Sequence, residues 1–224
     1  ELFGEKHDYT LTSMNNLASC LSYLGRDVEA IEIYRELVPL KKELFGVKDV
    51  GTVISLNNLG MALHKTGKHA KSLTLLEEAF KAGSELMGEA HPQMLSTQRF
   101  MADCHAVLGD VEKAVVIYSR VVPGAEKAFG SSDARLDQYL FEYGFALVQL
   151  GKYDVSIPVL KRVETIYQEA FGADDSRTKG ARLDWITIRS ESGEQLTPEE
   201  EEEGSRLFGE VMSKAAGETP ETGK

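Results

Sequence analysis

The feature of this sequence that most restricts its fold is a pair of glycine series that recur every 42 residues. One series falls at Gly4, Gly46, Gly88, Gly130 and Gly172, and the second falls at Gly25, Gly67, Gly109, Gly151 and Gly193. Two interleaved series with one period indicate an internal repeat, because the same two positions of every unit are glycine. The chain is therefore expected to consist of consecutive 42-residue units.

Each unit has the pattern of two helices joined by short connections. A residue able to cap a helix stands three positions after the first glycine of each unit; these residues are His7, Asp49, His91, Asp133 and Asp175. Apolar residues at helical spacing follow, until the second glycine ends the helix in the left-handed conformation that glycine adopts without strain. A longer second helix leads to the next unit, so the pattern predicts antiparallel helix pairs.

Small residues recur where the two helices of a unit must approach closely. One position of the first helix holds Ala18, Gly60, Ala102 and Gly144, and one position of the second holds Ala30, Ser72, Ala114 and Ser156. Larger residues are expected to pack against them, namely Leu17, Leu59, Met101 and Tyr143 on the first helices and Tyr34, Leu76, Tyr118 and Leu160 on the second. A single pair cannot bury its apolar face alone, so the units are expected to stack into an all-α solenoid.

Two segments of the first unit carry a family resemblance. The residues Leu2-Phe3-Gly4-Glu5-Lys6-His7 and Thr10-Leu11-Thr12-Ser13-Met14-Asn15-Asn16-Leu17-Ala18 resemble the 42-residue tetratricopeptide repeats of kinesin light chains. The second unit keeps Asn57-Asn58-Leu59-Gly60 and the third keeps His91-Pro92, whereas the third and fourth units replace Asn-Asn-Leu by Arg99-Phe100-Met101 and Phe141-Glu142-Tyr143. The resemblance covers residues 1–172 well and residues 173–192 weakly. It implies a right-handed α-solenoid, the tetratricopeptide superhelix, of the kind that many microbial signalling proteins also carry.

The repeat sets the expected domain boundaries. Four repeats are expected at residues 4–45, 46–87, 88–129 and 130–171, and residues 1–3 match the end of a preceding repeat helix, as in a piece of a longer array. Residues 172–216 are expected to form a degenerate fifth repeat and a C-terminal capping helix, which begins with Thr197 as N-cap and Pro198 at its first position. The apolar stripe of this helix is Leu207, Phe208, Val211 and Met212. Residues 217–224 are expected to be a disordered tail.

Charge and cysteine content restrict the partners. The net charge of −11 argues against nucleic acid and against an anionic membrane as the main partner. Cys20 and Cys104 are the only cysteines, which favours a reducing, cytoplasmic location. They share one repeat position, where they are expected to be small buried packing residues, too far apart for a disulfide.

No catalytic, cofactor or metal site is expected. His7 and His91 are interpreted as helix caps, and His64 and His69 are five positions apart, not the four that place two imidazoles on one helix face. Gly67-Lys68 and Gly151-Lys152 lack the earlier glycine of a phosphate-binding loop. We therefore expect a protein that is not an enzyme.

Binding is expected on the first helices, which in proteins of the resembled family line a concave face that holds extended peptides. The positions on that face are Asn15, Ser19, Tyr23, Asn57, Met61, His64, Lys65, Arg99, Asp103, Gln138, Phe141 and Phe145. The asparagines could pair with a peptide backbone, Lys65 and Arg99 could select an acidic group, and the apolar side chains could adapt to a partner. A second interpretation is that Asn15 and Asn57 only hold neighbouring helices together.

The expected function is a non-catalytic module that binds a protein or peptide. One alternative is a regulatory role, in which the array senses or restrains an ATPase or protein kinase domain of the same parent chain. Another is self-association through the truncated N-terminal edge.

Overall fold

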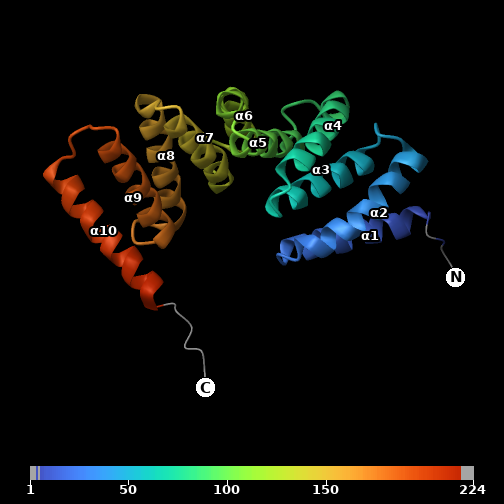
Figure 1. Ribbon diagram of the computed structural model, residues 1–224, viewed down its shortest axis with the longest axis horizontal. Helices are drawn as coiled ribbons and strands as arrows, with labels where there is room; N and C mark the ends of the chain where they lie inside the picture. The colour runs from blue at the N-terminus through green and yellow to red at the C-terminus, as the bar shows by residue number, and fades with distance from the viewer. Residues whose placement is uncertain (1–3, 5, 218–224) are drawn as a thin grey trace, which may run out of the picture. The chain divides into compact units, whose positions relative to one another are not determined.

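The computed structural model describes residue 4 and residues 6–217, with side chains as far as residue 212. Every regular element in this part of the chain is a helix (Figure 1). The elements are α1 (Asp8–Tyr23), α2 (Asp27–Phe45), α3 (Val50–Lys65), α4 (His69–Met87), α5 (Pro92–Val107), α6 (Val111–Phe129), the short 3₁₀ helix η1 (Ala134–Leu136), α7 (Asp137–Gln149), α8 (Tyr153–Phe171), α9 (Ser176–Glu191) and α10 (Pro198–Gly217). The expectations for residues 1–3 and 218–224 lie outside the described residues, and Gly217 ends α10. No described helix combines the length and the apolar character that crossing a membrane requires.

The five predicted N-terminal caps are confirmed. His7, Asp49, His91, Asp133 and Asp175 each accept a hydrogen bond from a backbone N–H of the helix that follows. In the fourth repeat the cap starts the single turn of η1, and α7 begins only at Asp137. The last helix has a reciprocal cap: Glu200 N donates to Thr197 Oγ1 at 3.2 Å, and Thr197 N donates to Glu200 Oε2 at 2.9 Å.

The glycine series also behaves as predicted. Gly25, Gly67, Gly109, Gly151 and Gly193 follow the first helices with φ between 68° and 94°, in the left-handed region. Among the described residues no residue other than glycine has a positive φ. A side chain at these positions would therefore strain the turn that brings each second helix back along the first.

The chain divides into two compact units, Glu1–Ala128 and Phe129–Lys224. The first unit contains the pairs α1/α2, α3/α4 and α5/α6, and its core includes Tyr34, Leu56 and Leu76, all fully buried. The second contains η1 and α7–α10, with Leu160 and Trp185 in its core.

A charged layer fastens the last helices of the second unit. Arg182 on α9 donates to Glu164 on α8 and to Glu203 on α10, both at 2.6 Å. Glu164 also accepts a hydrogen bond from Trp185 Nε1 at 2.6 Å, and Lys161 lies 3.9 Å from the centre of the Trp185 ring. The ion pairs and the tryptophan together hold α9 between its two neighbours.

The small residues at the helix crossings come in two combinations. Where the first helix has glycine, the second has serine and leucine: Ser72 Oγ donates to Gly60 O at 2.7 Å, and Leu76 lies over Gly60. A Cβ atom on Gly60 would stand 2.7 Å from Leu76 Cδ2, closer than packed carbons allow. The fourth repeat repeats this arrangement, with Ser156 Oγ 2.9 Å from Gly144 O. The first and third repeats combine two alanines with a tyrosine instead.

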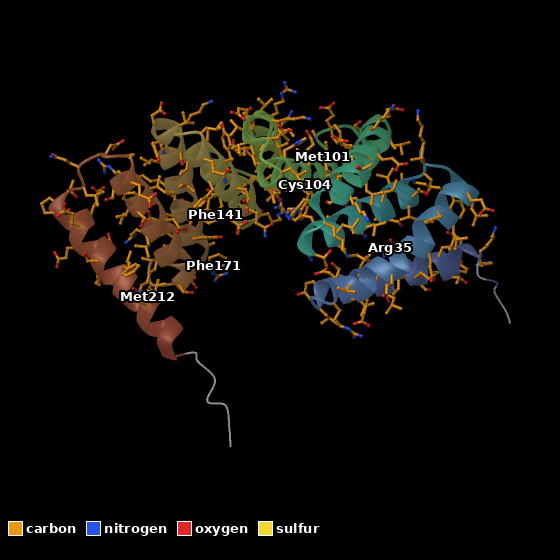
Figure 2. The ribbon with its side chains drawn as sticks, viewed as in Figure 1. Arg35, Met101, Cys104, Phe141, Phe171 and Met212 are labelled. Atoms are coloured by element: carbon orange, nitrogen blue, oxygen red, sulfur yellow. The ribbon has the colours of Figure 1, made fainter. Side chains whose placement is uncertain are left out.

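Two packing predictions, for Leu17 and Cys20, are wrong. Leu17 is 55% exposed, because α1 packs on α2 and α3 and Leu17 lies on the side that these helices leave open. Cys20 is also exposed, because it too lies on a side of α1 that α2 and α3 leave open. Cys104 is buried as expected. On α10 only Leu207 of the apolar stripe is buried; Phe208, Val211 and Met212 are exposed, the last of which is labelled in Figure 2.

Candidate protein-binding face

Hydrogen bonds between equivalent positions join the first helices of the first unit. Ser55 Oγ donates to Asn15 Oδ1 at 2.9 Å, which links α3 to α1. One repeat further on, Thr97 Oγ1 donates to Asn57 Oδ1 at 2.7 Å, which links α5 to α3. Asn57 is fully buried and directs its Nδ2 to Met61 Sδ at 3.2 Å. These contacts are those of the second interpretation above, in which the asparagines hold neighbouring helices together.

A second recurring contact joins the first helix to the second within a repeat. The hydroxyls of Ser19 and Tyr34 are 2.8 Å apart, and in the third repeat Tyr118 donates to Asp103 at the same two positions. Arg99 Nη1 donates to the other oxygen of Asp103 at 3.1 Å. Both Arg99 and Asp103 are buried, and burial raises the pKa of Asp103 even though Arg99 and Tyr118 act to lower it. The predicted binding residues Arg99 and Asp103 are thus partners of each other in the interior.

Other predicted positions remain accessible. Tyr23 is 91% exposed, Lys65 is exposed, and Ser19 and Met61 are half-buried. Lys65 Nζ lies 3.3 Å from Ser22 Oγ and 3.7 Å from Asp27 Oδ1, with 42% of its side chain exposed. Tyr23 and Lys65 occupy the same position in successive repeats, and Ser19 and Met61 share another. We call Ser19, Tyr23, Met61 and Lys65 the first-helix face.

In the second unit the predicted positions lie on α7. Gln138 is exposed, whereas Phe141 and Phe145 are half-buried, with their ring centres 4.6 Å apart and the rings tilted by 44°. Both rings pack against the buried cluster that contains Leu160 and Trp185. One side of each ring therefore packs against the core, and the other side is partly exposed to solvent (Figure 2 labels Phe141).

The structure also brings together three residues that we expected to be unrelated. His64 at the end of α3, His69 at the start of α4 and Cys104 on α5 have ligand atoms that all lie within 4.8 Å of one another. His64 Nδ1 is 3.3 Å from His69 Nδ1 and 3.4 Å from Cys104 Sγ. Burial, reinforced by the charges of His69 and Arg99, lowers the pKa of His64 to about 4. Burial also raises the pKa of the Cys104 thiol.

We expected no metal site, partly because His64 and His69 are five residues apart, and this reasoning from their spacing does not apply here. A spacing of four residues applies to two histidines on one helix, but His64 and His69 lie on either side of a turn. Cys104 comes from the next repeat, 40 residues after His64 in the sequence. The shared neighbourhood follows from the 42-residue register, which places the end of each first helix beside the first helix of the following repeat.

A separate pocket of about 370 Å³ opens in the first unit among α4, α5, α6 and the loop before α5. It is lined by Phe80, Glu89, Ala90, Leu95, Gln98, Met101, Ile117, Arg120, Val121 and Gly124. Only Met101 and Leu95 are contributed by α5 as apolar side chains. The pocket therefore offers a second surface on which a partner could bind, distinct from the first-helix face.

Two sequence profiles described as tetratricopeptide repeat match the chain, at residues 10–49 and 51–127. The two matches together span just over half of the chain, and the described helices pair as the repeat requires. The chain belongs to the tetratricopeptide repeat family. Its tetratricopeptide repeats form an all-α solenoid whose units resemble those of kinesin light chains. A comparison with curated proteins found no match.

Three solved structures illustrate the likeness of fold. The crystal structure of a putative kinesin light chain with nearly identical TPR-like repeats, from Podosopora anserina, is 19% identical with a TM-score of 0.74; the match covers 96% of this chain and 99% of that one. A Rap protein in complex with competence and sporulation factor is 12% identical with a TM-score of 0.67, and the match covers 91% of this chain and 53% of that one. YrrB, described as a tetratricopeptide repeat protein with an unusual peptide-binding site, is 14% identical with a TM-score of 0.59, covering 89% and 87%.

Proposed function

We propose that this chain is a non-catalytic module that binds a protein or peptide segment through its first helices. Support comes from two of the structures of like fold, one described with a bound factor and the other with a peptide-binding site. The observation on this chain that carries the proposal is Tyr23, a large aromatic residue that is 91% exposed on the first-helix face. An exposed tyrosine is a frequent anchor in protein interfaces because it combines apolar area with a hydroxyl.

Lys65 gives the face its preference for an acidic group. It occupies the position of Tyr23 in the next repeat, its contact with Asp27 is long at 3.7 Å, and 42% of its side chain is exposed. Charge on such a face steers association and selects among partners more than it adds affinity. Met61 and Ser19 complete the face with an adaptable apolar surface and a hydroxyl.

The second unit, taken by itself, offers a further candidate surface on α7. Gln138 offers an amide to solvent, and Phe141 and Phe145 offer the outer sides of two rings that the core already holds in place. Rings fixed in this way lose little conformational entropy when a partner covers them. The proposed ligand is thus an extended segment with an apolar or aromatic side chain and an acidic group.

The test is selection of peptides from a random display library on the full chain, followed by affinity measurement with single variants. Tyr23→Ala and Lys65→Glu change accessible side chains of the first-helix face and leave the interior intact. The expected result is binding that is weakened at least ~10-fold by each change, with the Lys65→Glu effect largest for acidic peptides. Asn57→Ala and Arg99→Glu are unsuitable here, because both residues are buried and their loss would disturb the fold.

The matched control is Arg120→Glu, which reverses a charge in the lining of the separate pocket. It should leave the affinity of the selected peptides unchanged. Peptides that respond to Arg120→Glu and not to Tyr23→Ala or Lys65→Glu would move the binding site to the pocket and overturn the assignment to the first helices.

A further inference from the structure

The three residues His64, His69 and Cys104 are not required by the packing of the repeat. At the positions of His64 and His69, the first repeat has Ser22 and Asp27, and the third and fourth repeats have small, apolar or aromatic residues. At the position of Cys104, the second and fourth repeats have alanine. A chain with only five histidines and two cysteines nevertheless places three of these seven residues in one cluster.

Two of the three spacings between the ligand atoms match those of a tetrahedral metal site. With Zn–N near 2.0 Å and Zn–S near 2.3 Å, tetrahedral geometry separates two nitrogens by about 3.3 Å and a nitrogen from a sulfur by about 3.5 Å. The structure has 3.3 Å between His64 Nδ1 and His69 Nδ1, and 3.4 Å between His64 Nδ1 and Cys104 Sγ. The remaining pair, His69 and Cys104, lies within 4.8 Å, so a small rotation of the half-buried His69 ring completes the site.

We propose that His64, His69 and Cys104 bind a Zn²⁺ ion, with a water molecule as the fourth ligand. Imidazole nitrogen and thiolate sulfur are the ligands that Zn²⁺ takes most often in proteins, and the ion imposes no geometry that the cluster cannot meet. On binding, the Cys104 thiol releases its proton to solvent, and the two imidazoles donate their Nδ1 lone pairs. The ion would join α3, α4 and α5 and so fasten the second repeat to the third.

Neighbouring groups orient the ligands. The ring of Phe100 meets the His64 ring edge-on with centres 5.4 Å apart, which fixes the orientation of that imidazole. Ser72 Oγ is 3.5 Å from Cys104 Sγ and is itself held by the carbonyl oxygen of Gly60. Such outer contacts are what keeps first ligands in position in metal sites. Figure 2 shows Cys104 on α5, beside the α3/α4 pair.

The positive charge of Arg99 would repel a bound Zn²⁺ ion, but it is paired with the carboxyl group of Asp103. Arg99 lies close enough to disfavour the protonated form of His64. Its guanidinium is paired with Asp103 at 3.1 Å, so the pair as a whole is neutral. In the first repeat the equivalent place already holds a cationic group, since Lys65 Nζ lies 3.3 Å from Ser22 and 3.7 Å from Asp27. There the carboxylate of Asp27 offsets the charge, and at the proposed site the thiolate of Cys104 would do so.

The test uses the full chain, reduced and freed of metal, with Co²⁺ as a spectroscopic probe and Zn²⁺ as competitor. Co²⁺ bound by a thiolate gives a sulfur-to-metal charge-transfer band in the near ultraviolet. We expect this band in the wild type, its loss on addition of Zn²⁺, and a thermal midpoint that rises with Zn²⁺ because only the folded chain has the site.

The chain supplies a matched pair of variants. Cys104→Ala should abolish the band and weaken Zn²⁺ binding at least ~100-fold, since even loss of an outer contact commonly costs about 10–100-fold. Alanine already stands at this position in the second and fourth repeats, as Ala62 and Ala146, so the fold should be kept. Cys20→Ala changes the other, exposed cysteine at the same repeat position and should leave the band intact.

His69→Gln gives an independent check at a half-buried position, where loss of fold is not expected. It should weaken Zn²⁺ binding and leave circular dichroism unchanged. The proposal is overturned if the wild type gives no charge-transfer band, if the band persists in Cys104→Ala, or if Cys20→Ala removes it. It is equally overturned if His69→Gln binds Zn²⁺ as tightly as the wild type.

Discussion

Asn57 accepts a hydrogen bond from Thr97 across two repeats, with 2.7 Å between Oδ1 and Oγ1, and neither side chain is exposed to solvent. The two residues are 40 positions apart and lie on consecutive first helices. One repeat earlier, Asn15 and Ser55 form the same contact. The bond therefore belongs to the stacking of repeats and not to one helix pair.

Removing the donor of this bond should weaken the fold. Thr97→Val keeps the shape of the side chain but leaves Asn57 Oδ1 buried without that donor, which should lower the free energy of unfolding by about 1–3 kcal/mol. Urea unfolding followed by circular dichroism measures the change. Thr74→Val is the control, because the exposed Thr74 hydroxyl donates to Ala70 O within its own helix. A Thr97→Val variant as stable as the control would show that the contact contributes nothing.

Gly60 should not tolerate a methyl group. Gly60→Ala would press its Cβ against Leu76 and cost about 1–3 kcal/mol of stability. The same change in a Leu76→Ala background should cost much less, because the obstructing atoms are gone. Gly180→Ala, on a helical glycine with nothing within 4 Å of the added carbon, should instead stabilise by about 0.5–1 kcal/mol. Thermal unfolding of the four variants tests this ordering, and equal effects of the two glycine changes would contradict it.

His105 stands where the other three full repeats have leucine. Its Nδ1 is 3.5 Å from Asp110, and its buried Nε2 has no hydrogen-bond partner within the described part of the chain. His105→Leu should therefore stabilise the protein by about 1 kcal/mol, measured as a higher urea midpoint. The converse change at the equivalent position, Leu63→His, should destabilise it. A destabilised His105→Leu variant would show that the imidazole makes a contact the fold needs.

Asp133 should make stability depend on pH in strong acid. Hydrogen bonds from the side chain and then the backbone of Arg135 lower the pKa of Asp133 to about 2. The pKa of Asp133 in the folded chain lies below its value in the unfolded chain. The contribution of the ionised Asp133 to folding stability is therefore fully present above about pH 4 and is lost as the pH falls through about 2. Arg135→Gln should return the pKa of Asp133 toward its ordinary value, as measured by NMR titration of the carboxyl group. An unchanged pKa in that variant would remove Arg135 as the cause.

The local features of the fold could be predicted from the sequence, since they depend on residues close together in the chain. Asp49 accepts a hydrogen bond from Thr52 N in the first turn of the helix that it precedes, and Gly67 follows the end of that helix with a positive φ. The environment of Asn57 could not be predicted in this way. Whether its amide faces a ligand or a neighbouring helix depends on Thr97 in the next repeat, and the choice between the two interpretations needed coordinates.

The candidate sites, too, could be predicted from the sequence only in part. The register identified Tyr23 and Lys65 as positions of one face, but it gave no measure of burial for Arg99, whose partner Asp103 is four residues along the same helix. The spacing along one helix does not apply to His64 and His69, because a turn separates them. The equivalent residues of the first repeat, Ser22 and Asp27, also meet across that turn.

The two combinations at the helix crossings have a consequence for how the sequence can change over time. Gly60, Ser72 and Leu76 depend on one another within a single helix pair, and Ala18, Ala30 and Tyr34 are buried in one cluster in the pair before it. Replacing one member alone passes through a poorly packed intermediate, whereas exchange of a whole repeat carries all three together. Recombination between repeats should therefore have been an easier evolutionary path for this chain than stepwise substitution at its crossings.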